Sequence, residues 1–100
     1  MRNVADIALT SRPKLASFAR LQHDTIRDRW VLQAPERVLV LDETSKEILD
    51  RCTGTETVEA IMSTLCTEYD APRETIEHDV FAVLRLLVEK TFVVIENESD

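Results

Sequence analysis

The segment Ala34-Pro35-Glu36-Arg37-Val38-Leu39-Val40-Leu41-Asp42-Glu43 sets the architecture of this chain, because the hydrophobic period changes at its end. Pro35 cannot donate a hydrogen bond to a sheet and therefore interrupts a strand. The aliphatic and β-branched run from Arg37 to Leu41 is typical of a short strand. After it, apolar residues recur every three to four positions, as they do in helices. We predict strands before this segment and helices after it.

Two further strands are predicted upstream. Side chains alternate in character over Phe18–His23, and a second run extends over Arg29–Gln33. The polar stretch Asp24–Asp28 between them predicts a hairpin turn, so the three strands form an antiparallel meander. Residues 1–12 show no sustained period and are predicted to be a flexible arm.

Three helices are predicted downstream. Thr44-Ser45-Lys46-Glu47 has the capping-box pattern and predicts the start of a short helix that Gly54 ends. Thr57 suits the N-cap of a second helix, and Pro72 suits the first position of a third. The stripe of the second helix comprises Val58, Ile61, Met62, Leu65, Cys66 and Tyr69, and that of the third comprises Ile76, Val80, Val83, Leu84, Leu87 and Val88.

The predicted fold is an α+β domain over residues 13–96, in which a three-stranded antiparallel sheet is followed by a three-helix bundle. This order is similar to that of a winged helix-turn-helix, a likeness at the level of the fold alone. The run Phe92–Ile95 is compatible with a short closing strand, and residues 97–100 form an acidic tail.

Charge and hydropathy restrict the partners. Nineteen acidic residues against twelve basic ones give a net charge of −7, which repels phosphate backbones and anionic lipid heads. We therefore expect neither nucleic acid nor membrane as a partner. The first residues lack the apolar block of a signal peptide, so the predicted location is cytoplasmic. Cys52 and Cys66 are predicted to be buried free thiols, with a disulfide or metal pair as the alternative.

No pattern in the sequence indicates catalysis. His23 and His78 lie on different predicted elements, and no spacing supplies the four ligands of a zinc site. A single glycine excludes a glycine-rich phosphate loop. The adjacent carboxylates of Asp42 and Glu43 precede a predicted helix, so a role at the helix start is favoured over acid/base chemistry. We expect a binding domain with no catalytic, cofactor or metal site.

The predicted strand Arg37–Leu41 is apolar on both faces and lies at the edge of the meander. An exposed apolar edge promotes aggregation unless something covers it or pairs with it. The third helix or the N-terminal arm could cover it, or the strand of a partner could add to it. Both alternatives, cover by the chain itself and pairing with a partner, are compatible with the sequence. Arg27, Arg29 and Arg37 could likewise pair with acids of a partner or serve solubility alone.

Several blocks of the chain resemble the pyrroloquinoline quinone biosynthesis protein D family (PqqD). The most specific block is Ala34–Glu43, which follows Arg29-Trp30-Val31-Leu32. Others are Arg12-Pro13-Lys14-Leu15, Ile48-Leu49 with Cys52, Gly54 and Thr57–Ile61, and Tyr69–Glu74 with Asp79-Val80 and Leu84. The resemblance covers about residues 12 to 95. Position 23 departs from the pattern, with His where an aromatic residue is expected, and the turn Asp24–Asp28 lacks a glycine.

The resemblance implies a small peptide chaperone with a winged-helix-like fold. Such a protein binds the ribosomal precursor peptide PqqA and presents it to the radical S-adenosylmethionine enzyme PqqE. The peptide adds as a strand beside the third strand, in the groove against the third helix. Carried onto this sequence, the implied peptide-binding residues are Arg37, Val38, Leu39, Val40, Leu41, Asp42, Asp79, Val80, Val83, Leu84, Leu86 and Leu87.

A winged-helix DNA-binding regulator is the alternative interpretation. It requires a basic recognition helix, but the predicted second helix carries Glu59 and Glu68 and neither lysine nor arginine.

Overall fold

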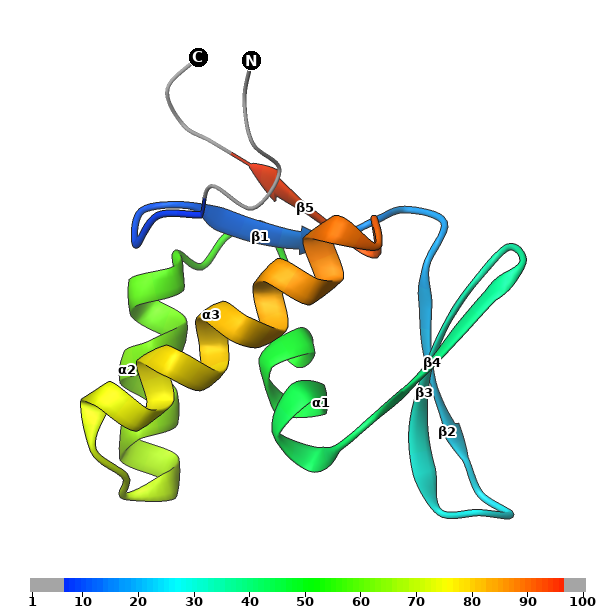
Figure 1. Cartoon of the computed structure of the whole chain (residues 1–100), viewed down its shortest axis with the longest axis horizontal. Helices are drawn as coiled ribbons and strands as arrows, with labels where there is room; N and C mark the ends of the chain where they lie inside the picture. Colours follow the sequence, from blue (N-terminus) through cyan, green and yellow to red (C-terminus); the bar gives the residue numbers. More distant parts are fainter. Residues whose placement is uncertain (1–6, 97–100) are drawn as a thin grey trace.

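A computed structural model describes residues 7–96 of the chain. In Figure 1 the three helices form one body, and a separate hairpin sheet projects from it beyond α1. We call strands β2–β4 the wing, and α1–α3 with β1 and β5 the helical body. The elements are β1 (Arg12–Leu15), β2 (Arg20–Asp24), β3 (Arg29–Ala34), β4 (Arg37–Leu41), α1 (Glu43–Asp50), α2 (Val58–Tyr69), α3 (Arg73–Glu89) and β5 (Val93–Glu96).

The wing is antiparallel with strand order β2-β3-β4, which confirms the predicted three-stranded sheet. Its first strand begins at Arg20 rather than Phe18, whose side chain is exposed. The first hairpin turn closes without glycine. The Asp24 carboxylate accepts backbone hydrogen bonds from Ile26 at 3.2 Å and Arg27 at 3.3 Å. Asp28 takes the left-handed conformation, with φ of 53°, that glycine adopts more readily.

The closing strand is present as β5, but it does not join the wing. It pairs antiparallel with β1, a strand that the sequence did not predict, in the register Pro13↔Ile95 and Lys14↔Val94. The sequence argued against a strand here because Pro13 lacks the N–H group that a strand donates to its neighbour. The carbonyl of Pro13 accepts a hydrogen bond from Gly54 N at 2.9 Å, which also ties β1 to the loop after α1.

The described part of the predicted arm is packed against the helical body rather than free. Ser11 is buried, and its carbonyl accepts a hydrogen bond from Val58 N at 2.9 Å. The carbonyl of Leu9 accepts one from Glu59 N at 3.0 Å. These bonds satisfy N–H groups in the first turn of α2, which have no partner inside the helix. The remainder of the predicted arm and the predicted tail, 97–100, lie outside the described residues.

The three helices are confirmed, but two of their starts and one end differ from the prediction. α1 begins at Glu43, with Asp42 as N-cap, rather than at a capping box led by Thr44. It ends at Asp50, and Gly54 lies in the following loop with φ of 88°. Pro72 is the N-cap of α3 instead of its first residue, because its ψ of 144° is extended. Thr57 caps α2 as predicted.

One buried cluster joins the wing to the helical body. Leu32 and Leu41 of the wing belong to it, together with Ile48 of α1. The rest of the cluster is dominated by the inward faces of α2 and α3: Val58, Ile61, Met62, Leu65, Ile76, Val80, Leu84 and Leu87. At the surface, the Lys46 ammonium of α1 lies 4.4 Å from the ring centroid of Trp30 in β3. The wing is therefore fixed to the body through α1.

No helix within residues 7–96 has both the length and the apolar character needed to cross a membrane.

The N-cap assignment gives a direct stability test. Asp42 Oδ1 accepts a hydrogen bond from Ser45 N at 2.8 Å, so Asp42→Ala should lower the free energy of unfolding by about 1 kcal/mol at neutral pH. Thr44→Ala is the matched control. Because Thr44 lies inside the first turn of α1, its replacement should leave stability unchanged or slightly higher. Urea unfolding measures the free energy of unfolding of both variants. A larger loss for Thr44→Ala than for Asp42→Ala would support the capping box led by Thr44 and contradict the N-cap at Asp42.

The same cap predicts a pH dependence. The hydrogen bond from Ser45 N lowers the pKa of Asp42 below its ordinary value. The stability that the charged cap contributes is therefore fully present above the unfolded pKa of about 3.9, and it is lost as the pH falls through the lower folded pKa. The stability difference between wild type and Asp42→Ala should shrink as the pH falls from about 5 through both pKa values, because the share of the cap that depends on the negative charge is lost. The stability difference between Asp42→Asn and Asp42→Ala should not change over this pH range, because the asparagine side chain does not titrate.

Candidate functional site

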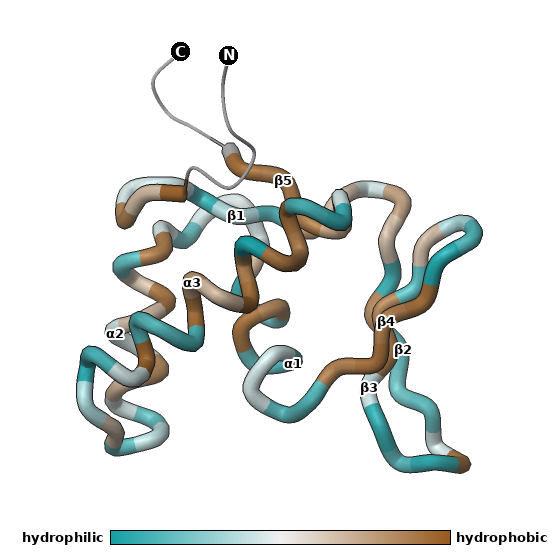
Figure 2. The backbone as a smooth tube through the Cα atoms, in the orientation of Figure 1, coloured by the Kyte–Doolittle hydropathy of each residue, from teal (hydrophilic) through white to brown (hydrophobic). Residues whose placement is uncertain are grey.

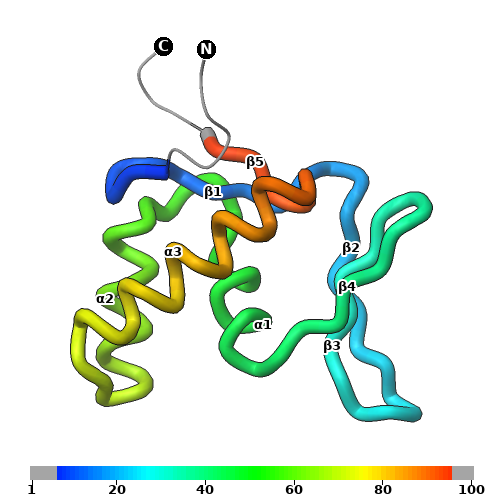
Figure 3. Tube along the Cα trace, viewed as in Figure 1, coloured from blue at the N-terminus to red at the C-terminus, as the bar shows by residue number. Residues whose placement is uncertain are grey.

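Strand β4 has one open edge. It is the last strand of the order β2-β3-β4, and among residues 7–96 no strand pairs with its outer side. Figure 3 shows the β4 trace standing apart from α3, with α1 continuing from its end. Figure 2 shows that β4 is one of the most hydrophobic segments of the trace. The apolar edge predicted from the sequence is therefore present and unpaired within the described chain.

The register identifies which backbone groups face the open edge. Pro35 and Glu36 form a two-residue turn, in which Glu36 has φ of 70°, and Ala34 pairs with Arg37 across it. The residues that flank such a turn exchange the first hydrogen bonds of the ladder, and bonded pairs then alternate. Arg37, Leu39 and Leu41 thus bond to β3. The N–H and C=O groups of Val38 and Val40 point to the open edge.

The side chains of β4 divide between two environments. Leu41 is buried and Leu39 half-buried, so this face of the strand meets the core. Val38 is 61% exposed and Val40 50% exposed on the opposite face. Val40 lies opposite Val31 of β3, so an apolar strip extends across the outer face of the wing. The side chains of a strand added at the edge can therefore contact side chains on both faces of β4.

The predicted groove residues on α3 are not equivalent. Three of them, Val80, Leu84 and Leu87, have no exposed surface and belong to the core cluster. These side chains pack α3 against the core. Val83 and Asp79 are half-buried, and Leu86 is 43% exposed. Only this second set offers side-chain surface to a ligand. Asp42, the remaining predicted site residue, is exposed at the start of α1 and caps it.

Arg37 connects β4 to the end of α3. Its Nη1 donates to the Lys90 carbonyl at 2.6 Å, and its Nη2 donates to Thr91 Oγ1 at 2.6 Å. Its guanidinium carbon lies 5.1 Å from the centroid of the Phe92 ring. A cation is favourable at this position because the carbonyls at a helix C-terminus carry a partial negative charge. Arg37 therefore links the wing to the body at the start of β4.

A hollow of about 330 Å³ lies beside this link. It is lined by Glu36, Arg37, Val38, Leu39, Lys90 and Phe92. Lys90, Thr91 and Phe92 belong to this part of the structure, although the sequence did not predict them as site residues. No local pattern could have found them, because the contacts of Arg37 with Lys90 and Thr91 join residues more than 50 positions apart.

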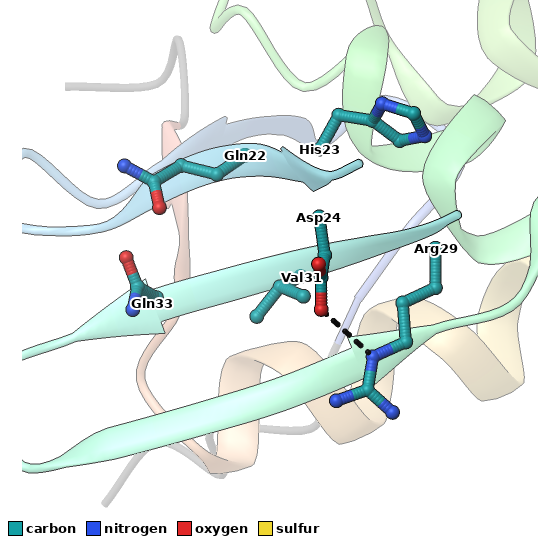
Figure 4. A pocket seen from close by; sticks show the side chains of 6 residues that line it. All are labelled: Gln22, His23, Asp24, Arg29, Val31 and Gln33. Carbon is teal, nitrogen blue, oxygen red and sulfur yellow. Dashed lines mark ion pairs between the residues drawn. The ribbon is translucent and has the colours of Figure 1, made fainter. Parts of the chain in front are cut away.

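A second hollow lies on the outer face of the wing, away from the open edge of β4. Figure 4 shows the side chains of Gln22 and Gln33 directed toward one another from neighbouring strands, beside Val31. The Arg29 Nε lies 3.5 Å from Asp24 Oδ2 at its other end. None of the residues implied by the family resemblance lines this hollow.

Each of the two histidines contacts neighbouring side chains. His23 packs on Trp30 with ring centroids 4.8 Å apart, and its Nε2 lies 3.1 Å from Asp28 Oδ1. It therefore replaces the aromatic residue expected at this position. His78 is exposed, with Nδ1 3.6 Å from Asp79 Oδ1. Within the described residues, no three side chains of His, Cys, Asp or Glu gather as ligands of a metal ion.

Cys52 and Cys66 are free, as predicted, but their environments differ. Cys52 is buried and Cys66 is half-buried. Burial raises the pKa of Cys52 to about 12, and its Sγ donates to the Ile48 carbonyl at 3.4 Å. Because the thiolate is the reactive form, Cys52 should be inert near neutral pH.

Thiol labelling tests this difference. At pH 8, one of the two thiols of the folded chain should react with an aromatic disulfide reagent, and the second should react only after denaturation. Cys66→Ser should abolish the fast phase, whereas Cys52→Ser should retain it. Two fast thiols in the folded wild type would contradict the buried, protonated state of Cys52.

Comparison with known proteins gives a consistent result. The family model described as "Coenzyme PQQ synthesis protein D (PqqD)" matches residues 29–93. A "PqqA binding protein" of Rhodopseudomonas palustris strain BisB5 is 44% identical over 98 residues, which cover 98% of this chain and 95% of that protein.

Two solved structures share the fold. One is the solution NMR structure of the PqqD truncation of Methylobacterium extorquens PqqCD, described as a functional and stand-alone recognition element for ribosomally synthesised, post-translationally modified peptides. It has a TM-score of 0.78 and 33% identity, covering 94% of this chain and 98% of that one. The other is TbiB1 in complex with the TbiA(β) leader peptide, with a TM-score of 0.68 and 26% identity, covering 87% of this chain and 99% of that one.

Proposed function

This chain belongs to the PqqD family of coenzyme PQQ synthesis proteins, and we propose that it binds the precursor peptide PqqA and presents it to the radical S-adenosylmethionine enzyme PqqE. The relatives named as PqqA binding proteins support the choice of peptide. The enzyme is the one implied by the family resemblance. The structural observation that carries the proposal is the unpaired edge of β4 beside α3.

The peptide binds by strand addition. Val38 and Val40 each offer one N–H donor and one C=O acceptor at the open edge, so an added strand can form up to four backbone hydrogen bonds. A typical hydrogen bond contributes about 1 kcal/mol net. These bonds accept any sequence, so the choice of peptide depends on alternate side chains. The structural neighbour bound to a leader peptide supports this type of ligand.

The burial of the predicted site residues supports different roles for them in the proposed groove between β4 and α3. Side chains of the added strand that point toward the body contact Leu39, Val83 and Leu86. Those that point the other way lie beside Val38 and Val40. Fully buried Val80, Leu84 and Leu87 hold α3 in position and touch the peptide only if the helix moves. The bound peptide extends the sheet of the wing to four strands and removes its apolar edge from water.

We infer a division of labour in which this domain holds the peptide and the partner enzyme modifies it. The side chains around the β4 edge are mainly aliphatic, which suits recognition of a peptide strand.

An NMR titration with PqqA tests the site. Adding the peptide to ¹⁵N-labelled chain should shift the backbone amides of residues 38–42, with the largest changes at Val38 and Val40, whose N–H groups face the edge. Amides near Val83 and Leu86 should shift as well. The turn at Asp24–Asp28, on the far side of the wing, is the internal control. Shifts confined to that turn or to α2 would contradict strand addition at β4.

Removal of one edge donor tests the backbone contribution. Val40→Pro deletes an N–H that faces the open edge, where proline is tolerated within sheets. Peptide affinity should fall roughly tenfold, since one lost hydrogen bond with its steric consequence is worth about 1 to 2 kcal/mol. Val40→Thr is the matched control, because it keeps the N–H and the branched shape. Equal affinities of the two variants, with both folded by circular dichroism, would exclude a bond at residue 40.

A further inference from the structure

The open edge alone cannot fix the register of a bound peptide. Backbone hydrogen bonds at Val38 and Val40 form equally well with a strand that has slipped. A slip of one residue turns every side chain of the added strand to the opposite face. A slip of two residues preserves the faces and changes only which side chain occupies each position. Something at a defined place along β4 must therefore recognise one particular peptide side chain.

The hollow at the start of β4 has the properties of such a subsite. Two of its lining residues, Arg37 and Lys90, are cationic, whereas the whole chain carries a net charge of −7. The Arg37 guanidinium is held in one orientation by two hydrogen bonds at 2.6 Å and by the Phe92 ring. A guanidinium has five N–H groups, and these two bonds use two of them. A fixed cation with remaining donors suits a carboxylate.

The position of Arg37 also selects which peptide side chains can reach it. Arg37 lies on the same face of β4 as Leu39 and Leu41, which is the face toward the helical body. Only those peptide residues that point to the body can enter the hollow. Since side chains alternate along a strand, the residues two and four positions away from an acidic residue there face Leu39 and its neighbours.

On the basis of the peptide-binding function proposed above, we propose that the hollow formed by Arg37, Lys90 and Phe92 is a carboxylate subsite. It accepts one Asp or Glu side chain of the bound peptide and sets the register of that peptide on β4. The peptide pattern that fits is an acidic residue followed or preceded at two-residue spacing by apolar residues, all directed toward α3. The recognised chemistry is a carboxylate on a strand, supported by backbone bonds to Val38 and Val40.

Two local features weaken the positive charge of the subsite. Glu36 also lines the hollow, and the carbonyl end of α3 carries a partial negative charge. Arg37 already donates to the Lys90 carbonyl, so it compensates the helix end. Lys90 then supplies the additional charge, and Glu36 opposes it. Glu36 therefore provides a test in the opposite direction to Lys90. Removing its negative charge should strengthen binding of an acidic peptide.

The experiment measures the affinity of PqqA for the full chain and three variants by calorimetry at low salt. Lys90→Gln removes one cation and keeps the backbone carbonyl that Arg37 contacts. It should weaken binding about threefold, the effect of one partly exposed ion pair. Glu36→Gln should strengthen binding by a similar factor. Arg85→Gln, which removes an exposed charge near Phe81 on α3, is the matched control and should leave the affinity unchanged.

A scan of the peptide identifies the recognised acid. Each Asp or Glu of PqqA is replaced in turn by its amide, and each peptide is titrated into wild type and Lys90→Gln. At one position the replacement should weaken binding to wild type about threefold and should abolish the effect of Lys90→Gln. Arg37 is left intact in all variants, since its loss would also remove the link between β4 and α3.

The outcomes separate this inference from the proposed function. If amides of β4 shift with PqqA but no peptide position is coupled to Lys90, strand addition stands and the carboxylate subsite is excluded. An equal loss for every peptide would indicate only general attraction and would also overturn the subsite. If PqqA does not bind the wild-type chain, both proposals fail. Coupling at one acidic position, with the opposite sign for Glu36→Gln, supports the subsite.

Discussion

The structure depends on how α3 uses its apolar stripe, because the buried part of that stripe packs into the core cluster. Ile76, Val80, Leu84 and Leu87 are buried in the core, where α3 packs on α1, α2 and β5. These buried side chains are therefore not available to cover the edge of β4, and Leu86 of α3 stays 43% exposed. The N-terminal arm, the second predicted cover, packs elsewhere in its described part: Leu9 and Ser11 accept hydrogen bonds from the start of α2, and β1 pairs with β5. Within the part of the chain that the structure describes, the edge of β4 therefore stays open because the apolar side chains of α3 and the strands β1 and β5 already have other partners.

The sequence predicted most elements of the fold because each carries its own periodicity. The change of period after Leu41 located the boundary between wing and helices, and both hairpins followed from turn residues. The errors arose where two local patterns compete or where partners are distant. Asp42 and Thr44 can both cap a helix, and the choice depends on the direction of the chain as it leaves β4. The pairing of β1 with β5 joins opposite ends of the domain around Pro13, and no short-range pattern indicates it.

The candidate site was only partly predictable for a related reason. Strand Arg37–Leu41 could be identified as an apolar edge from its composition, and the family resemblance added α3 as its neighbour. A resemblance specifies the helix but not which face of it remains accessible, so buried Val80, Leu84 and Leu87 were grouped with accessible Val83 and Leu86. The link from Arg37 to Lys90 and Thr91 depends on the packed arrangement of wing and body. Such contacts follow from tertiary structure and have no counterpart in local sequence.

The two sides of the proposed groove belong to different parts of the molecule. The edge is part of the wing, and the opposite wall is part of the helical body. The space between them therefore depends on how the wing is attached. At one end the chain passes from β4 into α1, and Lys46 packs on Trp30. At the other end Arg37 donates to the terminus of α3. A strand bound along β4 lies between these two attachments. In the proposed complex, the free energy of peptide binding is thus coupled to the orientation of the wing. Arg37, which forms one of the two attachments, is also the residue proposed to contact a peptide carboxylate.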